Sequence, residues 1–207
     1  MRLSYLFALA AALPLLASCG SDLKVVSGGT HSPGSTTKDF KVTPPSSTLI
    51  ASAAGKPKDK HSMPVYPFSE RHRVVRTTAY THTESDHLVY GNHSALGTEL
   101  RYTPEYHSVA ADWSRFPLGT KFRIRGYDRI FVVDDYGSAL VGTHTIDVYF
   151  PDKDRMNGWG LRFVDIEILS FGSFHESRKI LAARAKNRYC LAMLASMTTD
   201  DWYETHR

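Results

Sequence analysis

The chain has 207 residues, of which 42% are hydrophobic and 12% aromatic, and its 25 Lys and Arg against 21 Asp and Glu give a formal charge of +4. This composition is that of a globular protein and excludes wholesale disorder and a membrane bundle. A charge this small, without a block of basic residues, argues against a nucleic-acid partner but is compatible with an anionic polymer.

The start of the chain has the pattern of an export signal. Arg2 precedes an apolar run over residues 3–16, which is too short for a comfortable membrane span. The run closes with Leu-Ala-Ser-Cys, which resembles the lipobox of bacterial lipoproteins. The resemblance implies a signal peptide over residues 1–18 and a lipid on Cys19. With Gly20 as the next residue, it also implies a location on the periplasmic face of the outer membrane.

Residues 19–69 are rich in Ser, Thr, Gly, Pro and Lys, and their apolar residues follow neither a helical nor a strand period. Such a segment buries too little apolar surface to offset the entropy of an ordered chain, so we predict a disordered tether over residues 19–69. A lipid on Cys19 leaves Cys190 without a partner for an intramolecular disulfide. Cys190 lies in an apolar run, and we expect it to be buried and without a chemical role.

Residues 70–172 contain short runs of alternating apolar residues separated by turn residues, a pattern typical of β-strands. The runs lie at residues 74–80, 121–125, 130–133, 145–149 and 162–169. Several short strands in one small domain predict a mainly β fold, either a barrel or a sandwich.

The C-terminal segment, residues 173–207, begins with a helix signal. Ser173 and Glu176 have the spacing of a capping box, and apolar residues follow at helical intervals. We therefore predict one helix over residues 174–196. Its basic residues are interpreted as a solvated face, with contact to an anionic polymer as the alternative.

Three aspartates, Asp112, Asp135 and Asp147, stand among apolar residues at predicted strand ends or beside turns. Aspartate is disfavoured in strands, and burying a carboxylate carries a desolvation cost. Taken singly, each of the three could cap a turn or face solvent. Three such placements in one short stretch of the chain nevertheless require an explanation.

The residues around these aspartates form an ordered set of motifs. Asp-Tyr-Gly-Ser-Ala-Leu-Val-Gly at residues 135–142 is followed by Ile-Asp-Val-Tyr at residues 146–149. Further elements lie at residues 78–80, 95–97, 111–112 and 116–120. Together they resemble the signature of the 3D, or three-aspartate, domain family, which also occurs in MltA-type lytic transglycosylases. The resemblance covers about residues 74–169 and implies a small double-psi β-barrel.

Four positions depart from the family pattern. Ser138 replaces the second Gly, Val141 replaces a frequent Lys, and Trp113 replaces the usual Pro. The pair Asp134 and Asp135 stands where the family has a single acidic residue. The spacing to the following glycines favours Asp135 as the second aspartate of the family, and strand alternation lets only one of the pair face the cleft.

The resemblance implies a peptidoglycan lytic transglycosylase, which cleaves the MurNAc-GlcNAc β-1,4 bond and forms 1,6-anhydro-MurNAc through the C6 hydroxyl of the same sugar. One acid/base suffices, because it can protonate the leaving oxygen and then take the proton of the C6 hydroxyl. By resemblance this residue is Asp147. Asp135 is expected to raise its pKa or to stabilise developing positive charge, and Asp112 to shape the site. Protonation near pH 7 requires a pKa well above the reference value of about 3.9, which burial or a second carboxylate provides.

The same resemblance places six further residues against the glycan: Thr78, Tyr80, Gly97, Gly137, Ser138 and Gly142. An aromatic ring such as that of Tyr80 can pack on a sugar face, and packing within its strand is an equal alternative. Glycines let the backbone approach the glycan closely. The expected partners are peptidoglycan strands and, through the lipid, the membrane, and neither nucleic acid nor a cofactor is expected.

Two other interpretations are open. A non-catalytic peptidoglycan-binding or scaffolding lipoprotein would keep the same barrel and groove. His82, Glu84, Asp86 and His87 could hold a metal ion, but their spacing matches no standard site and favours a polar loop. The sequence around Ser138 does not form the Gly-x-Ser-x-Gly turn of serine hydrolases.

Overall fold

The computed structural model describes residues 40–84 and 88–197. The predicted signal peptide, the predicted lipidation site Cys19 and the predicted tether up to residue 39 lie outside the described residues. Within the described part of the chain, no helix is long and apolar enough to cross a membrane.

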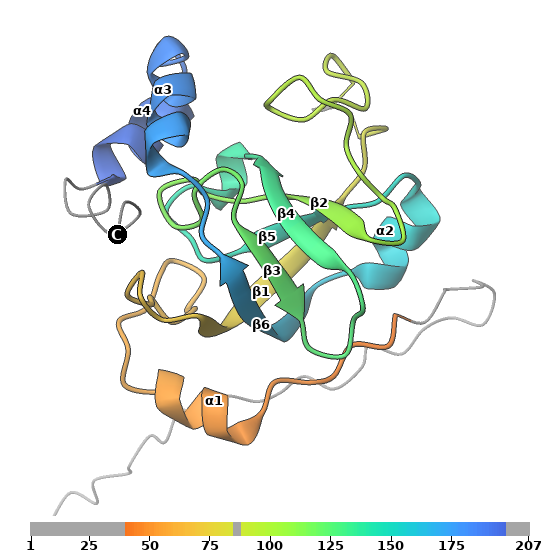
Figure 1. Ribbon diagram of the computed structural model, residues 1–207, viewed down its shortest axis with the longest axis vertical. Coiled ribbons are helices and arrows are strands. Elements are labelled where there is room, and N and C mark those ends of the chain that lie inside the picture. Colours follow the sequence, from red (N-terminus) through yellow and green to blue (C-terminus); the bar gives the residue numbers. More distant parts are fainter. Residues whose placement is uncertain (1–39, 85–87, 198–207) are drawn as a thin grey trace, which may run out of the picture. The chain divides into compact units, whose positions relative to one another are not determined.

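The described strands close into a barrel, which confirms the prediction of a mainly β fold and decides between barrel and sandwich (Figure 1). The strands are β1 (His72–Tyr80), β2 (Tyr106–Ala110), β3 (Lys121–Ile124), β4 (Ile130–Asp135), β5 (Ile146–Tyr149) and β6 (Arg162–Ser170). Around the barrel their order is β1, β5, β2, β4, β3, β6. β1 pairs with β5 and β2 with β4 in parallel, and the other neighbours are antiparallel. The double-psi description stays a prediction.

All five predicted runs are strands in the structure, but β2 was not predicted. His107 and Ser108 in β2 are polar, and both are 0% exposed. Their neighbour Val109 is also fully buried, so β2 has no alternation between a buried and a solvent face. A strand that is covered on both sides and carries polar residues gives no periodic signal in the sequence.

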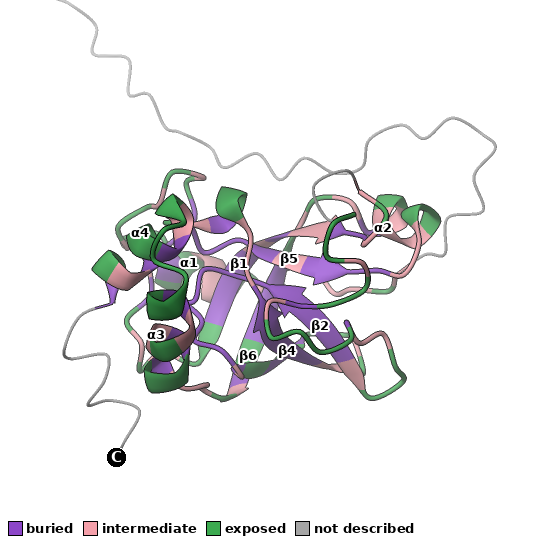
Figure 2. Ribbon diagram, turned by 90° about the horizontal axis from the view of Figure 1, so that it is seen from above, coloured by how far each residue is buried: buried purple, intermediate pink, exposed green. Residues whose placement is uncertain are grey.

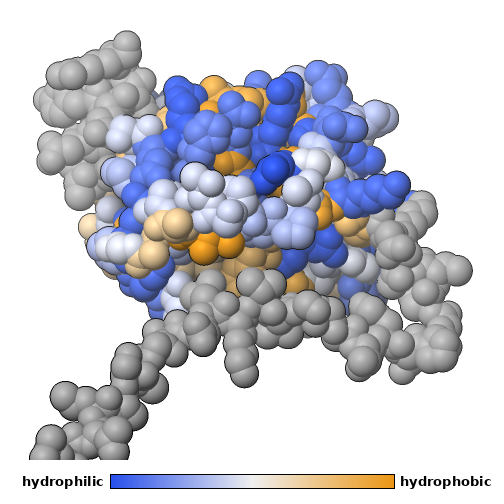
Figure 3. Space-filling model, turned by 90° about the horizontal axis from the view of Figure 1, so that it is seen from below, coloured by the Kyte–Doolittle hydropathy of each residue, from blue (hydrophilic) through white to orange (hydrophobic). Residues whose placement is uncertain are grey.

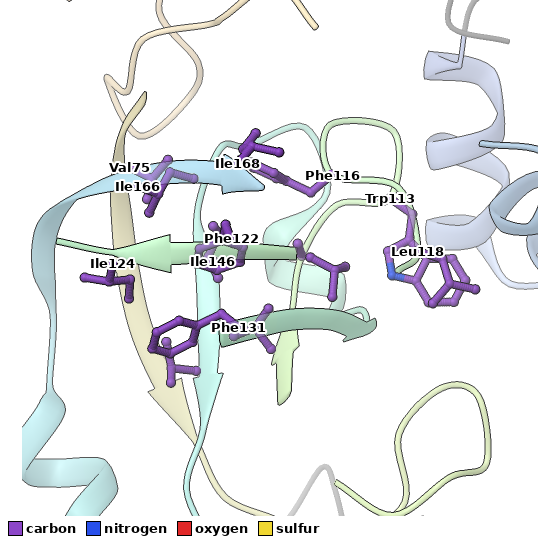
Figure 4. Packing of buried hydrophobic residues seen from close by; sticks show 14 of the residues in the cluster. Val75, Trp113, Phe116, Leu118, Phe122, Ile124, Phe131, Ile146, Ile166 and Ile168 are labelled. Carbon is purple, nitrogen blue, oxygen red and sulfur yellow. The ribbon is translucent and has the colours of Figure 1, made fainter. Parts of the chain in front are cut away.

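The barrel interior holds the hydrophobic core. Along β3, Phe122 and Ile124 are buried while Lys121 and Arg123 are exposed, as the two-residue period of a strand requires. Phe122 stacks on Phe131 of β4 with ring centroids 5.2 Å apart. Figure 4 shows how these side chains fill the space between the strands. Their removal from water supplies much of the stability of the fold.

The N-terminal part of the described chain corrects the predicted tether, because residues 40–69 are folded against the barrel. Helix α1 (Ser47–Ala53) begins at Ser46, whose side chain accepts a hydrogen bond from Leu49 N. Ser46 N also donates to Asp165 Oδ2 on β6 over 3.0 Å. This segment therefore belongs to the folded domain.

The tether prediction failed because the apolar residues of this segment are few and widely spaced. Phe40 packs on Phe150 with ring centroids 5.0 Å apart, and Phe68 packs on Phe171 at 3.8 Å. Tyr66 is 6% exposed and accepts a hydrogen bond from Val74 N. An irregular segment that inserts single aromatic rings into the barrel surface shows no period in its sequence.

The C-terminal segment corrects a second prediction, since it forms two helices instead of one. α3 (Phe174–Ala183) is capped by Ser173 as predicted, with Oγ accepting from Glu176 N. α4 (Arg188–Ser196) is capped by Asn187, a signal that sequence analysis missed. The break folds α4 back on α3, so that both helices bury one side and expose the other (Figure 2). Cys190 is fully buried, as predicted.

One further helix, α2 (Lys153–Trp159), was not predicted. Its N-cap Asp152 accepts a hydrogen bond from Arg155 N. Trp159 at its end is 1% exposed and donates from Nε1 to Thr77 Oγ1 on β1 over 3.2 Å. This short helix, which lies between β5 and β6 along the chain, packs against β1.

Replacing Phe68 by Ala tests whether residues 40–69 belong to the fold. Loss of its ring from the contacts with Phe171 and Phe174 is expected to lower the free energy of unfolding by about 2–4 kcal/mol. Urea denaturation of the full-length chain measures this change. Exposed Ser69→Ala is the matched control. Equal midpoints for the two variants would restore the tether interpretation.

Candidate functional site

Two of the three aspartates lie on either side of one residue of β2. Ala110 pairs through its backbone with Asp135 on β4 and with Asp147 on β5. Asp147 in turn lies opposite Thr78 on β1. The barrel therefore places Thr78, Asp147, Ala110 and Asp135 in one row across four adjacent strands.

A shift in the pairing of β2 and β4 separates the two members of the acidic pair. Ala110 pairs with Asp135 where regular register would place Asp134. Asp134 is 1% exposed and accepts hydrogen bonds from Ser108 Oγ at 2.7 Å and from Arg101 at 3.1 Å. Asp134 thus serves barrel structure, which supports the choice of Asp135 as the second aspartate of the site.

Asp147 is the least buried of the three aspartates. Its strand neighbours Ile146 and Val148 are both 0% exposed, whereas Asp147 keeps partial contact with solvent. Thr78 Oγ1 donates a hydrogen bond to Asp147 Oδ1 over 2.7 Å. Within residues 40–84 and 88–197 this is the one hydrogen bond found for the carboxyl group, so Oδ2 is the oxygen that a ligand can reach.

Burial raises the pKa of Asp147 to about 6. The hydrogen bond from Thr78 and the charge of Arg76 act in the opposite direction, while the carboxylates of Glu84 and Asp135 add to the rise in pKa. Asp135 therefore acts in the predicted direction, although burial is the main cause. The contribution of Glu84 was missed, because sequence analysis placed it in a polar loop.

Asp135 is held by donors from three segments. Its Oδ2 accepts a hydrogen bond from Tyr80 Oη at 3.0 Å, and its Oδ1 accepts from Ala95 N and Tyr136 N, both at 2.9 Å. Tyr80 is itself buried, and burial together with the charge of Asp135 raises the pKa of Tyr80 well above its usual value. Tyr80 therefore keeps its proton and orients Asp135, which favours the packing interpretation of this residue over sugar stacking.

Asp112 has no access to solvent and acts as a structural acceptor. Its Oδ1 accepts hydrogen bonds from Ser114 N at 2.8 Å and Ser114 Oγ at 2.7 Å. Its Oδ2 accepts from Gly142 N over 2.6 Å and so ties the loop before β5 to the turn after β2. The site-shaping role that the sequence suggested for Asp112 stays a prediction.

Among the other residues expected near the glycan, Thr78 lies on β1 within this row, and the serine and glycines lie on loops. Ser138 is exposed at the start of a short 3-10 helix, η1 (Ser138–Leu140), and Gly137 before it is half-buried. Gly97 and Gly142 are exposed, and their φ angles of 75° and 77° lie in the left-handed region that favours glycine. Thr78 is half-buried beside Asp147. Each of these residues except Tyr80 keeps some access to solvent.

Two contacts around the site were not foreseen. Arg184, just after α3, donates to Ala95 O at 2.8 Å and to Tyr136 Oη at 3.3 Å, so the C-terminal helices support the loop that holds Asp135. His82 Nδ1 lies 2.9 Å from Tyr149 Oη at the end of β5. Arg184 carries no sequence signal for this role, because it lies far from the motifs along the chain.

The metal interpretation has no support in the part of the chain that the structure describes. There, no three His, Cys, Asp or Glu side chains lie close enough to hold an ion. His82 contacts Tyr149, and Glu84 accepts a hydrogen bond from Thr81 N at 3.1 Å. Asp86 and His87 lie outside the described residues.

A cavity of about 720 Å³ lies elsewhere, beside α1 and against β3 and β6. Its walls include Leu49, Arg123, Tyr127 and Asp165, and none of the three aspartates of the site. The face that carries α1 is mixed in character, with hydrophobic patches among hydrophilic side chains (Figure 3). Volume alone does not make this cavity the functional site, because the half-buried carboxyl groups lie elsewhere.

The closed barrel carries a row of buried and half-buried carboxyl groups, and part of its sequence matches the model of a protein family. Residues 107–170 match the family model of the 3D domain. The match begins in β2 and ends in β6, and it includes Asp112, Asp135 and Asp147.

Two curated proteins of Bacillus subtilis (strain 168) are similar to this chain. It is 38% identical over 97 residues to the "Putative cell wall shaping protein YabE", a match that covers 47% of this chain and 23% of that protein. It is 31% identical over 101 residues to the "Cell wall-binding protein YocH", covering 49% of this chain and 34% of that protein. The chain thus spans about a quarter to a third of the length of these relatives.

Replacing Asp112 by Ala tests its structural role. The change leaves two donors of buried Ser114 without an acceptor and removes the acceptor of Gly142 N, and we expect a loss of about 3 kcal/mol in unfolding free energy. Thermal and urea unfolding measure it, with exposed Asp128→Ala as the control. A variant as stable as the control would show that Asp112 does not hold the loop.

Proposed function

We propose that the chain is a peptidoglycan lytic transglycosylase with Asp147 as its single acid/base. The observation that carries the proposal is the half-buried carboxyl group of Asp147, with Oδ1 held by Thr78, Oδ2 within reach of a ligand and a pKa of about 6. The 3D domain match and the names of the two relatives, which refer to cell wall shaping and cell wall binding, support a role on peptidoglycan.

The proposed reaction uses one proton that leaves Asp147 and returns to it. Because Thr78 donates to Oδ1, the acidic proton belongs on Oδ2. It passes to the glycosidic oxygen as the bond from this oxygen to C1 of MurNAc breaks. The C6 hydroxyl oxygen then bonds to C1, and its proton returns to Asp147. No water enters the products, and the carboxyl group ends in its starting state.

Asp135 and Asp112 have supporting roles in this proposal. The charge of Asp135, held in place by Tyr80 and Ala95, lies two strands from Asp147 and favours positive charge developing at C1. Asp112 fixes the loop at Gly142 and so the entrance to β5. Gly97, Gly137, Ser138 and Gly142 are the proposed backbone contacts of the glycan.

The anchoring of the protein is part of the same proposal. A lipid on Cys19, after removal of residues 1–18, would hold the domain at the cell envelope, on the periplasmic face of the outer membrane. The substrate is a polymer fixed in the same compartment. A membrane-bound enzyme of this kind meets its substrate without having to diffuse from elsewhere.

Digestion of purified peptidoglycan by the full-length chain tests the reaction. We expect muropeptides ending in 1,6-anhydro-MurNAc by mass spectrometry. Asp147→Asn should lower their release by about 10²–10⁴-fold, because an amide cannot transfer the proton. Asp128→Asn is the control, since Asp128 is exposed and absent from the row of carboxyl groups.

Other products of this digestion have definite meanings. Muropeptides with reducing ends would indicate a hydrolase and contradict the transglycosylase. Sedimentation of the chain with the wall, without any release, would favour the binding lipoprotein, the alternative suggested by the name of YocH.

The pH dependence of the reaction follows from the protonated form being the active one. With a pKa of about 6, the proton is lost from Asp147 as pH rises, so kcat/KM should fall about tenfold per pH unit above that value. Thr78→Val removes the hydrogen bond that lowers this pKa, and the falling limb should move to higher pH. If kcat/KM falls over the same pH range in the wild type and in Thr78→Val, the titrating group is not Asp147.

A further inference from the structure

The N-terminal segment and β1 bring two basic side chains together beside Asp147. His61 Nδ1 lies 3.0 Å from Thr145 Oγ1, and Arg76 donates to the same oxygen over 3.2 Å. Thr145 stands two residues before Asp147, and Arg76 two residues before Thr78. Two residues along a strand cover about 6–7 Å. The positions that carry the two basic side chains are therefore separated from Asp147 by less than the length of a disaccharide.

His61 is held firmly, although sequence analysis placed it in a tether. Asp59 accepts hydrogen bonds from His61 N at 2.8 Å, Met63 N at 3.0 Å and His144 N at 2.6 Å. Burial alone would raise the pKa of Asp59, but these three N–H groups outweigh it and lower the pKa. The side chain of Asp59 is 3% exposed, so its charge faces the backbone that it fixes and not the solvent.

The two basic side chains keep donors for a ligand. Both His61 and Arg76 are half-buried, whereas Thr145 between them is 0% exposed. When Arg76 donates to Thr145 Oγ1, the hydroxyl proton can point to His61 Nδ1, which places the ring proton on Nε2. The guanidinium has five N–H donors in a planar fork suited to two-point binding of a carboxylate.

The charged groups around His61 and Arg76 favour an anion on that side of Asp147 only. Exposed Lys60 lies nearby, with Nζ donating to Val141 O at 3.1 Å. The carboxylate of Glu84 acts on Asp147 from beyond the end of β1, away from Arg76, and that of Asp135 acts from two strands away across the row. A substrate with a negative group would therefore be oriented with that group toward Arg76.

We propose that His61 and Arg76 form a subsite that binds a carboxylate of the glycan strand and so sets the register of cleavage at Asp147. The inference rests on the proposed substrate, in which every second sugar carries a lactyl ether ending in a carboxylate or in a peptide that has carboxylates. Both residues lie outside the family match at residues 107–170.

Binding measurements test the subsite without using cleavage. The full-length chain in detergent, carrying Asp147→Asn, is titrated with labelled glycan strands that bear peptides, with the same strands after amidation of their carboxyl groups, and with peptide-free strands. Arg76→Gln and His61→Gln should each weaken binding of the carboxylate-bearing strands by about five- to tenfold and leave amidated strands unaffected. Arg76→Lys should restore part of the loss. Arg123→Gln, an exposed arginine on β3, is the matched control.

Each outcome of these binding measurements supports or contradicts the carboxylate subsite. Weakening confined to peptide-free strands assigns the free lactyl carboxylate, and weakening confined to peptide-bearing strands assigns a peptide carboxylate. Weakening with both kinds of strand shows that the subsite accepts either carboxylate. The subsite is wrong if the Asp147→Asn chain and both of its variants prefer carboxylate-bearing over amidated strands to the same degree. It is also wrong if the Asp147→Asn chain binds no strand. His61→Gln decides alone if Arg76→Gln does not fold. Carboxylate-dependent binding by a wild-type chain that releases no anhydro products would overturn the transglycosylase and leave the subsite standing.

Discussion

The order of the strands in the barrel is the constraint on which the site depends. Since β2 lies between β4 and β5, Ala110 has an aspartate beside it on both sides. An open sheet with β4 and β5 at distant edges would not bring Asp135 and Asp147 to the same row. Burying these carboxyl groups carries a desolvation cost, which hydrogen-bond donors on neighbouring strands and loops offset. Two of these donors, Thr78 and Tyr80, lie on β1.

The sequence predicted most of the barrel because its strands obey a simple period. Phe122 and Ile124 alternate with charged residues, and this pattern alone places β3. β2 lacked such a pattern because His107 is buried beside Tyr149, whose carbonyl oxygen it contacts. Burial holds its pKa down to about 3, so the ring is neutral in the core. A polar residue made compatible with the interior by one specific contact cannot be recognised from local sequence.

The sequence named candidate site residues, which stay a prediction, but it foretold few of the contacts that hold them. The motif spacing selected Asp112, Asp135 and Asp147, and the structure brings the last two beside Ala110. The donors to Asp135 come from Tyr80 and Ala95, positions 55 and 40 residues away. Such contacts depend on how the barrel closes and on how loops cross it. The N-terminal segment illustrates the same limit, because Asp59 reaches His144 across 85 positions.

The hydrogen bonds of the site also bear on how the chain folds. Thr78 reaches Asp147 across 69 positions and Asp112 reaches Gly142 across 30, so neither bond can form within one local hairpin. Non-local pairing of this kind is slow, because loop entropy is lost before contacts compensate for it. The raised pKa of Asp147 needs the finished wall of protein around it, so a chain that is still collapsing has an ordinary, ionised aspartate there. The raised pKa of Asp147 is thus acquired only at the last stage of folding, when the protein around its carboxyl group is complete.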